Sequence, residues 1–272
     1  MKFGDCMSDK MRDVFETNGN FSVLKEMSLG GSGGNLPKWL IEDSNGLLYY
    51  AKGRSRQDSF EPEAEVCACR LACLFGVNAI SYELLVLTEL SEQPVCVCRD
   101  YSNGQTVMSL YRYVEAVTGI DPANFTGIEK FRLVESALDA EDKNLHAAVL
   151  YLDYAIGNTD RHLRNFDVRV NAEGGLLGLV PMFDAGACLF SSESESQIRM
   201  ACGQSDNYVH SKPYADPHSA QLQLMRSMGY APSFKPVKKE DIYKTINGCF
   251  AGNRAKLLGR YVTLNLERLG LL

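Results

Sequence analysis

Three polar residues in the middle of the chain constrain its fold more than any other feature. Asp160 and Asn165 stand five positions apart, and Asp184 follows later, directly before an Ala-Gly pair. Between Asn165 and Asp184, apolar residues alternate on both sides of an Asn- and Gly-rich turn at residues 171–175, a pattern that predicts a β-hairpin. A hairpin returns the chain to its start. We therefore expect Asp184 to face Asn165 across the base of the hairpin.

These three side chains have the chemistry that phosphoryl transfer requires. The carboxylate of Asp160 can accept a proton from a hydroxyl group, and the amide oxygen of Asn165 can bind a metal ion together with Asp184. Two oxygen ligands of this kind suit Mg²⁺, which usually takes its other ligands from substrate phosphates and water. A loop rich in Asp and Asn also contains such pairs by chance, so the spacing alone leaves both interpretations open.

Length and composition set wide limits on the class of protein. The 272 residues suffice for two lobes or one large domain, and 45% apolar residues are typical of a globular chain. The net charge of −6 argues against a broad nucleic-acid-binding surface, so we expect no direct contact with nucleic acid. No basic and apolar leader or membrane-length apolar run occurs. We expect no membrane contact, and a protein that is cytoplasmic or is exported by a route that leaves no recognisable signal.

A glycine-rich segment lies ahead of these residues, at positions 28–38. Gly31, Ser32, Gly33 and Gly34 form a backbone that can approach a ligand closely, with N–H groups suited to phosphate oxygens. It is not a Walker A loop, because the Gly-Lys-Ser/Thr sequence is missing. A flexible turn has the same composition. We expect these four residues to contact a nucleotide only if the following segments support that function.

The next segment predicts a strand that carries a lysine. Residues 39–52 form two apolar runs on either side of an Asn-Gly pair, which is a strong hairpin signal. Period-two alternation places Lys52 on the same face as Tyr50. In the small lobe of a kinase, a Lys on a strand that follows the glycine-rich loop reaches the phosphates of ATP. A lysine at a strand end that extends into water is the alternative.

A helix predicted at residues 59–76 supplies a partner for this lysine. Ser59 suits the N-cap, and Gly76 suits the C-terminal cap. Glu65 heads the apolar stripe of the helix, where a carboxylate requires a cation, and Lys52 is the natural candidate. A Lys–Glu pair between a strand and a helix is the arrangement that positions the ATP-binding lysine of kinases.

Beyond this helix we expect strands at residues 79–87 and 94–99, followed by a polar lobe junction near residues 98–104. An adenine ring would lie against the junction and bind to Cys98, Asp100 and Tyr101. Apolar spacing of the helical kind covers most of the remaining chain, at residues 108–117, 131–138, 145–156, 222–228 and 242–271. Residues 191–217 are rich in Ser, Asp and Pro and suit a loop on the substrate side, with the structure of residues 197–202 left open.

These segments resemble the kinase region of the HipA-like serine/threonine kinases. The matching blocks are Gly33-Gly34-x-x-Pro37-Lys38, Ala51-Lys52, Pro62-x-x-Glu65-x-x-x-x-Arg70-Leu71-Ala72-x-x-x-Gly76, Asn158-Thr159-Asp160-x-His162-x-x-Asn165-Phe166 and Phe183-Asp184. The resemblance implies an α+β, bilobal, protein-kinase-like fold. Residues 1–100 would form a small β-rich N-lobe with one main helix, and residues 101–272 a larger, mostly helical C-lobe.

The resemblance also implies a role for each site residue. Asp160 would be the catalytic base, and Arg164 would balance phosphate charge beside it. Asn165 and Asp184 would hold Mg²⁺. Lys52, supported by Glu65, would bind the phosphates of ATP. His162 would brace the catalytic loop rather than react. The substrate would be a protein hydroxyl group, and the chain would phosphorylate itself.

Two departures from the family pattern affect these expectations. Only 27 residues precede Ser28, too few for the additional N-terminal subdomain of the toxin-type members. The chain therefore resembles the compact, free-standing members, which include an effector-like bacterial kinase that acts inside host cells, or a split toxin with an antitoxin or companion chain. The first resemblance implies secretion into a host cell without a recognisable signal peptide. Gly31 stands where the family has its autophosphorylated serine, which leaves Ser32 or Ser28 as the candidate. A small-molecule or lipid kinase, and a nucleotide-binding regulatory module without turnover, are the alternative functions.

Overall fold

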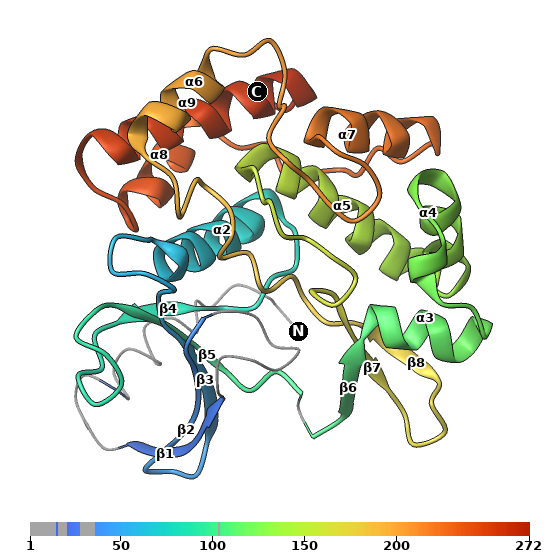
Figure 1. Ribbon diagram of the computed structural model, residues 1–272, viewed down its shortest axis with the longest axis horizontal. Coiled ribbons are helices and arrows are strands. Elements are labelled where there is room, and N and C mark those ends of the chain that lie inside the picture. The colour runs from blue at the N-terminus through green and yellow to red at the C-terminus, as the bar shows by residue number, and fades with distance from the viewer. Residues whose placement is uncertain (1–14, 16–20, 28–35, 103) are drawn as a thin grey trace.

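The computed structural model describes residues 15, 21–27, 36–102 and 104–272. The smaller lobe contains an antiparallel sheet of five strands in the order β1-β2-β3-β5-β4 (Figure 1). The strands are β1 (Phe21–Met27), β2 (Lys38–Asp43), β3 (Leu48–Lys52), β4 (Glu83–Leu85) and β5 (Val95–Arg99). The predicted nucleotide contacts Gly31, Ser32, Gly33 and Gly34, and also Ser28, lie outside the described residues.

The β2–β3 hairpin was predicted and is confirmed. The Asp43 carboxylate accepts hydrogen bonds from the backbone N–H groups of Asn45 (2.8 Å) and Leu47 (2.9 Å), and Gly46 adopts a positive φ of 77° in the turn. The register pairs Lys38 with Lys52 at the other end of the hairpin. Both lysines therefore lie at the same end of these two strands, the end that faces the larger lobe.

The predicted helix forms α2 (Glu61–Phe75), which Gly76 ends in the left-handed conformation as expected. Its start differs from the prediction, because Phe60 and not Ser59 occupies the N-cap position. The Ser59 hydroxyl instead donates to the backbone carbonyl of Arg56 at 2.8 Å, in the loop before the helix. Local hydrogen bonding of serine competes with capping, so the side chain alone does not fix the helix start.

Helix α2 is buried on both faces. One face packs against the sheet through Val66 and Cys69. The other face belongs to the core of the larger lobe, to which it contributes Ala64, Cys67, Ala68, Leu71, Ala72 and Phe75. In Figure 1, α2 lies between the five-stranded sheet and helices α5 and α8.

The larger lobe is mostly helical. Its helices are α3 (Leu110–Thr118), α4 (Gly127–Ser136), α5 (Ala140–Ile156), α6 (Glu195–Cys202), α7 (His218–Ser227), α8 (Lys239–Asn247) and α9 (Gly252–Leu269), with a short 3-10 helix at Pro122–Asn124. Helix α5 is buried along most of its length and packs against α7 and α9. It ends at Gly157, directly before the segment that carries Asp160. Among the residues that the structure describes, no helix is both long and apolar enough to cross a membrane.

A second sheet lies in the larger lobe, in the order β6-β7-β8. Strands β7 (Asp167–Val170) and β8 (Leu176–Leu179) form the hairpin predicted between Asn165 and Asp184. Strand β6 (Thr106–Ser109) corrects the prediction that helix begins at residue 107 or 108. The β-branched residues Thr106 and Val107 pair with β7, and Ser109 then caps α3.

Other boundaries differ from the prediction in smaller ways. Strand β1 was not predicted, and the strand expected at residues 79–87 is confined to Glu83–Leu85. Helix α6 (Glu195–Cys202) forms within residues 191–217, where a loop was expected and the structure of residues 197–202 was left open. The α+β class, with a small β-rich lobe and a larger helical lobe, is confirmed. The division at residue 100 stays a prediction.

Candidate active site

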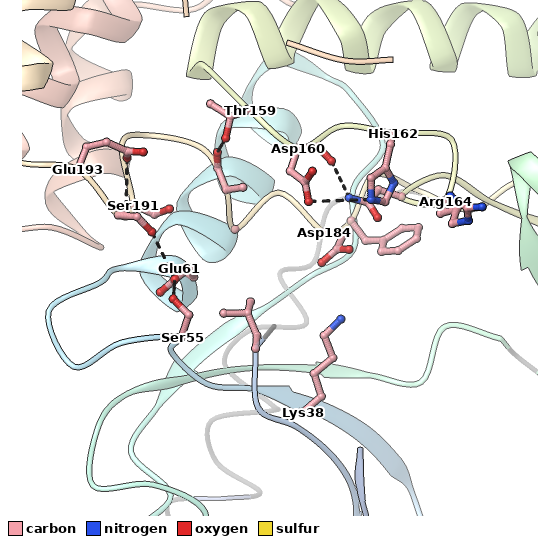
Figure 2. Close-up of a pocket in the computed structure, with 16 residues that line it drawn as sticks. Lys38, Ser55, Glu61, Thr159, Asp160, His162, Arg164, Asp184, Ser191 and Glu193 are labelled. Carbon is pink, nitrogen blue, oxygen red and sulfur yellow. Dashed lines mark hydrogen bonds and ion pairs between the residues drawn. The ribbon is translucent and has the colours of Figure 1, made fainter. Parts of the chain in front are cut away.

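A cavity of about 510 Å³ lies between the two lobes. Asp160, Asn165 and Asp184, the three residues singled out by their spacing, all line it. Lys38 at the start of β2 lines it from the smaller lobe. Figure 2 shows Asp160 and Asp184 beside the same cavity, with Lys38 across from them. The hairpin β7–β8 has therefore brought the two ends of the predicted motif together.

Asp160 is held by contacts on both sides of its carboxylate. Its backbone N–H donates to Asn158 Oδ1 at 3.2 Å, and its Oδ1 accepts from Lys212 Nζ at 2.9 Å. His162 Nε2 lies 3.9 Å from Oδ2. The Asp160 side chain remains 50% exposed, so a substrate can reach it.

Arg161 is fully buried and braces this segment. Its Nε donates to Asp153 Oδ2 at 2.8 Å, and its Nη1 donates to the backbone carbonyls of Asn165 (2.9 Å) and Phe183 (2.7 Å). Burial opposes the charged form of Arg161, but Asp153 outweighs that effect and raises the pKa of the guanidinium. One side chain thus ties together the two ends of the β7–β8 hairpin. His162 was expected to brace the loop, whereas its side chain is 38% exposed and faces Asp160.

Asn165 and Asp184 offer oxygen atoms suited to a metal ion. Asn165 is buried, and its Nδ2 donates to the backbone carbonyl of Asp160 at 2.9 Å, which fixes the amide and leaves its oxygen as the possible ligand. Asp184 adopts a positive φ of 55°, an uncommon conformation for a residue other than glycine. An amide oxygen and a carboxylate on one cavity are a donor set that fits Mg²⁺.

Lys52 joins the smaller lobe to this site. Its Nζ lies 2.9 Å from Asp184 Oδ1 and 3.5 Å from Glu65 Oε2, so the predicted Lys52–Glu65 pair is present. Burial alone would lower the pKa of Lys52, but the carboxylates of Asp184 and Glu65 raise it above its usual value. The ammonium therefore stays charged between two carboxylates.

Two lysines of the smaller lobe keep the Asp184 carboxyl ionised. Burial alone would raise the pKa of this carboxyl, but Lys52 and Lys38 lower it below its usual range. Gly186 permits the close approach of this segment to α2, because a Cβ atom there would lie 3.3 Å from Glu65 Oε2 and from the Glu61 carbonyl. The segment after Asp184 thus packs against the helix that carries Glu65.

Comparison with solved structures identifies the fold. The crystal structure of the Helicobacter pylori proinflammatory kinase CtkA matches with a TM-score of 0.67 and 14% sequence identity, over 93% of this chain and 94% of that chain. The chain has a kinase fold. The kinase-type fold expected from the resemblance to the HipA-like kinases is therefore confirmed. No protein-family model matches the sequence, and no curated protein matches it in sequence.

Two further solved structures match this chain with lower TM-scores. HipA of the Shewanella oneidensis MR-1 toxin–antitoxin system, solved with HipB and operator DNA, matches with a TM-score of 0.46 and 12% identity, over 91% of this chain and 65% of that chain. A macrolide 2′-phosphotransferase type I matches with a TM-score of 0.31 and 10% identity, over 97% of this chain and 95% of that chain.

The junction residues expected to contact adenine do not line the cavity. The backbone N–H of Asp100 donates to the Leu48 carbonyl at 2.8 Å, so the sheet already uses it. Cys98 is buried, and burial raises the pKa of its thiol to about 12. The Tyr101 ring lies 5.4 Å from the Phe183 ring, next to the site. Their predicted role in binding a base stays a prediction.

Arg164 lies at the rim of the cavity (Figure 2). Its side chain is exposed, and the guanidinium lies 4.3 Å from the centre of the Tyr111 ring. Arg164 therefore lines the same cavity as Asp160, with its guanidinium over the Tyr111 ring. Its predicted role in balancing phosphate charge stays a prediction.

The buried His218 supports the start of the catalytic segment. Its Nε2 lies 2.9 Å from the Asn158 carbonyl, and the neutral imidazole donates this hydrogen bond. Burial lowers the pKa of His218 to about 4, although the nearby Asp153 opposes that shift. The folded chain thus keeps His218 neutral over a pH range in which the unfolded chain protonates it.

We expect this histidine to make the fold sensitive to acid. Between pH 6.5 and about 4 the unfolded chain binds a proton at His218 that the folded chain does not, so the free energy of unfolding falls as the pH falls. The full effect is up to about 3 kcal/mol, from about 1.4 kcal/mol per pKa unit. His218→Gln, whose amide can still donate to Asn158, should lose that part of the pH dependence. Urea titrations at pH 7 and at mildly acidic pH measure it, and an unchanged acid slope would contradict this origin.

Proposed function

We propose that the chain is an ATP- and Mg²⁺-dependent serine/threonine protein kinase. The observation that supports this most directly is the convergence of Asp160, Asn165 and Asp184 on one cavity, with Lys52 from the other lobe bound to Asp184. These are the side chains that phosphoryl transfer needs, at the boundary between the lobes of a kinase fold.

Each residue has a role in this proposal. Asp160 accepts the proton of the acceptor hydroxyl, and Lys52 binds the phosphates of ATP while Glu65 supports it. Asn165 and Asp184 would hold Mg²⁺, which neutralises phosphate charge when it is bound. Arg164 and Lys38 place positive charge at the same cavity. Phosphorylation of the chain's own Ser32 or Ser28, an antitoxin-like companion chain and a toxin or effector role are further parts of the proposal.

Incubation with Mg²⁺ and ATP labelled at its γ-phosphate tests the function. We expect label on protein serine or threonine, either on the chain itself or on proteins of a cell lysate, and we expect removal of Mg²⁺ with EDTA to abolish it. Mass spectrometry of the phosphorylated peptides locates the acceptor. Label on metabolites without labelled protein would favour a small-molecule kinase. Binding of ATP in calorimetry without transfer to any acceptor would favour a regulatory module instead.

A further inference from the structure

Lys212 contributes an ammonium group to the site from a distant part of the chain. Its Nζ lies 2.9 Å from Asp160 Oδ1, and it belongs to the segment between α6 and α7. We propose that Lys212 is a positioning residue for phosphoryl transfer, which holds the Asp160 carboxylate in the orientation that accepts the substrate proton. This inference rests on the proposed function.

The backbone on the N-terminal side of Lys212 is fixed. Ser211 is buried, its hydroxyl donates to the Ala215 carbonyl at 2.6 Å, and its N–H donates to Asp216 Oδ1 at 3.1 Å. The Asp216 carboxylate also lies 2.8 Å from His210 Nδ1. These contacts close a turn around Lys212, so its position does not depend on the ion pair with Asp160.

The C-terminal side of Lys212 is anchored in the core. Tyr214 is buried, and its hydroxyl lies 3.0 Å from His146 Nε2 on α5. The Tyr214 N–H donates to Gln221 Oε1 on α7 at 3.1 Å. Lys212 therefore extends from a rigid support, and its side chain reaches Asp160 across the surface of the larger lobe.

Stability does not explain this ion pair. The side chains of Lys212 and Asp160 are 43% and 50% exposed, and an exposed ion pair contributes only about 0–1 kcal/mol. The surrounding loop is held by other groups, including the buried Ser211 and Tyr214, and not by the ammonium. The effect of the pair is therefore local: it occupies Oδ1 of Asp160 and leaves Oδ2, on the side of His162, for the acceptor hydroxyl.

The proposed step is a simple transfer. The acceptor hydroxyl gives its proton to Asp160 Oδ2, the bond between the acceptor oxygen and the γ-phosphorus forms, and the bond from that phosphorus to the bridging oxygen breaks, so that ADP leaves. Phosphoryl transfer depends mainly on positioning and electrostatics. The orientation that Lys212 gives to the Asp160 carboxylate is therefore what this ion pair would contribute to the step.

Lys212→Met is the decisive variant, because it removes the charge and keeps an apolar chain of similar length. With ATP labelled at its γ-phosphate, Mg²⁺ and casein as acceptor, we expect kcat to fall about 10²-fold. The KM for ATP should change less than about twofold, because Lys212 does not touch the proposed ATP ligands. The thermal midpoint should stay within about 4 °C of the parent value, as expected for an exposed pair.

Three further variants separate positioning from other effects. Lys212→Arg keeps a cation and should recover most of kcat. Lys256→Met makes the same chemical change at an exposed position of α9 and should leave kcat unchanged. In an Asp160→Asn background, Lys212→Met should cause no further loss of rate, because a positioning residue acts through the group that it orients.

The possible failures are distinguishable. A Lys212→Met protein as active as the parent, or more active, overturns the inference and leaves the proposed kinase function intact; higher activity would make Lys212 a latch that blocks Asp160. An equal loss of rate in the parent and in the Asp160→Asn background also overturns it. If the parent protein transfers phosphate to no acceptor, the proposed function itself is wrong, and the inference falls with it.

Discussion

Replacing Asp160 with asparagine is expected to reduce the rate of phosphoryl transfer by about 10²- to 10⁴-fold, the usual contribution of a general base. The amide has nearly the same shape as the carboxylate, and its oxygen can still accept the hydrogen bond from Lys212 Nζ. What it loses is the ability to take the proton of the acceptor hydroxyl. Initial rates of label transfer from ATP, at equal Mg²⁺ concentration, measure the effect.

The matched control for this prediction is Asp58→Asn. Asp58 is 84% exposed and pairs with Arg56 at 3.6 Å, so the same chemical change there should leave the rate unchanged. Calorimetry should show that both variants bind ATP like the parent, because Asp160 is not a proposed ATP ligand. Label transfer at the parent rate by the Asp160→Asn protein would remove this residue from its proposed role.

Replacing Arg161 with methionine is expected to lower the free energy of unfolding by about 3–5 kcal/mol. Arg161 and Asp153 are both fully buried, and the substitution leaves the Asp153 carboxylate without its cationic partner. It also removes the hydrogen bonds to the carbonyls of Asn165 and Phe183. Urea unfolding of the variant and the parent measures the loss of stability, and transfer assays should show a parallel loss of activity.

A double variant distinguishes an unpaired charge from lost packing. Arg161→Met combined with Asp153→Leu removes both buried charges, and we expect it to recover part of the stability that the single variant loses. Activity should not recover, because the carbonyls at both ends of the hairpin still lack their donor. A single variant as stable as the parent would show that the buried pair does not hold this part of the fold.

The part of the site that the sequence predicts is the part that depends on short-range structure. The spacing of Asp160 and Asn165, with a hairpin leading to Asp184, brings three functional groups together within one short stretch of chain. The Lys52–Glu65 pair was predictable for a similar reason, because strand alternation and a helical stripe each fix the face on which a residue lies.

The rest of the site depends on contacts that no local pattern encodes. In the sequence, Arg161 looks like an ordinary charged loop residue. Only its burial against Asp153 shows that it holds the two ends of the β7–β8 hairpin together. Lys212 reaches Asp160 across 52 positions of sequence, from a segment without periodicity. Strand β6 (Thr106–Ser109) was missed because four residues are too few to show a pattern, and its partner β7 selects its conformation.

The position of α2 has a consequence for how such a protein could be regulated. Helix α2 contributes to the larger core, and the backbone of Met182, close to Asp184, hydrogen-bonds to Asn78 and Ile80 just beyond this helix, so we expect Glu65 to stay with Asp184 when the lobes move. Lys52 belongs to the sheet of the other lobe. If the lobes separate, two neighbouring carboxylates lose the cation between them, which is costly in a partly dehydrated site. Charge neutralisation therefore favours a closed cleft, and we expect opening, rather than an outward swing of α2, to be the movement that breaks the Lys52–Glu65 contact.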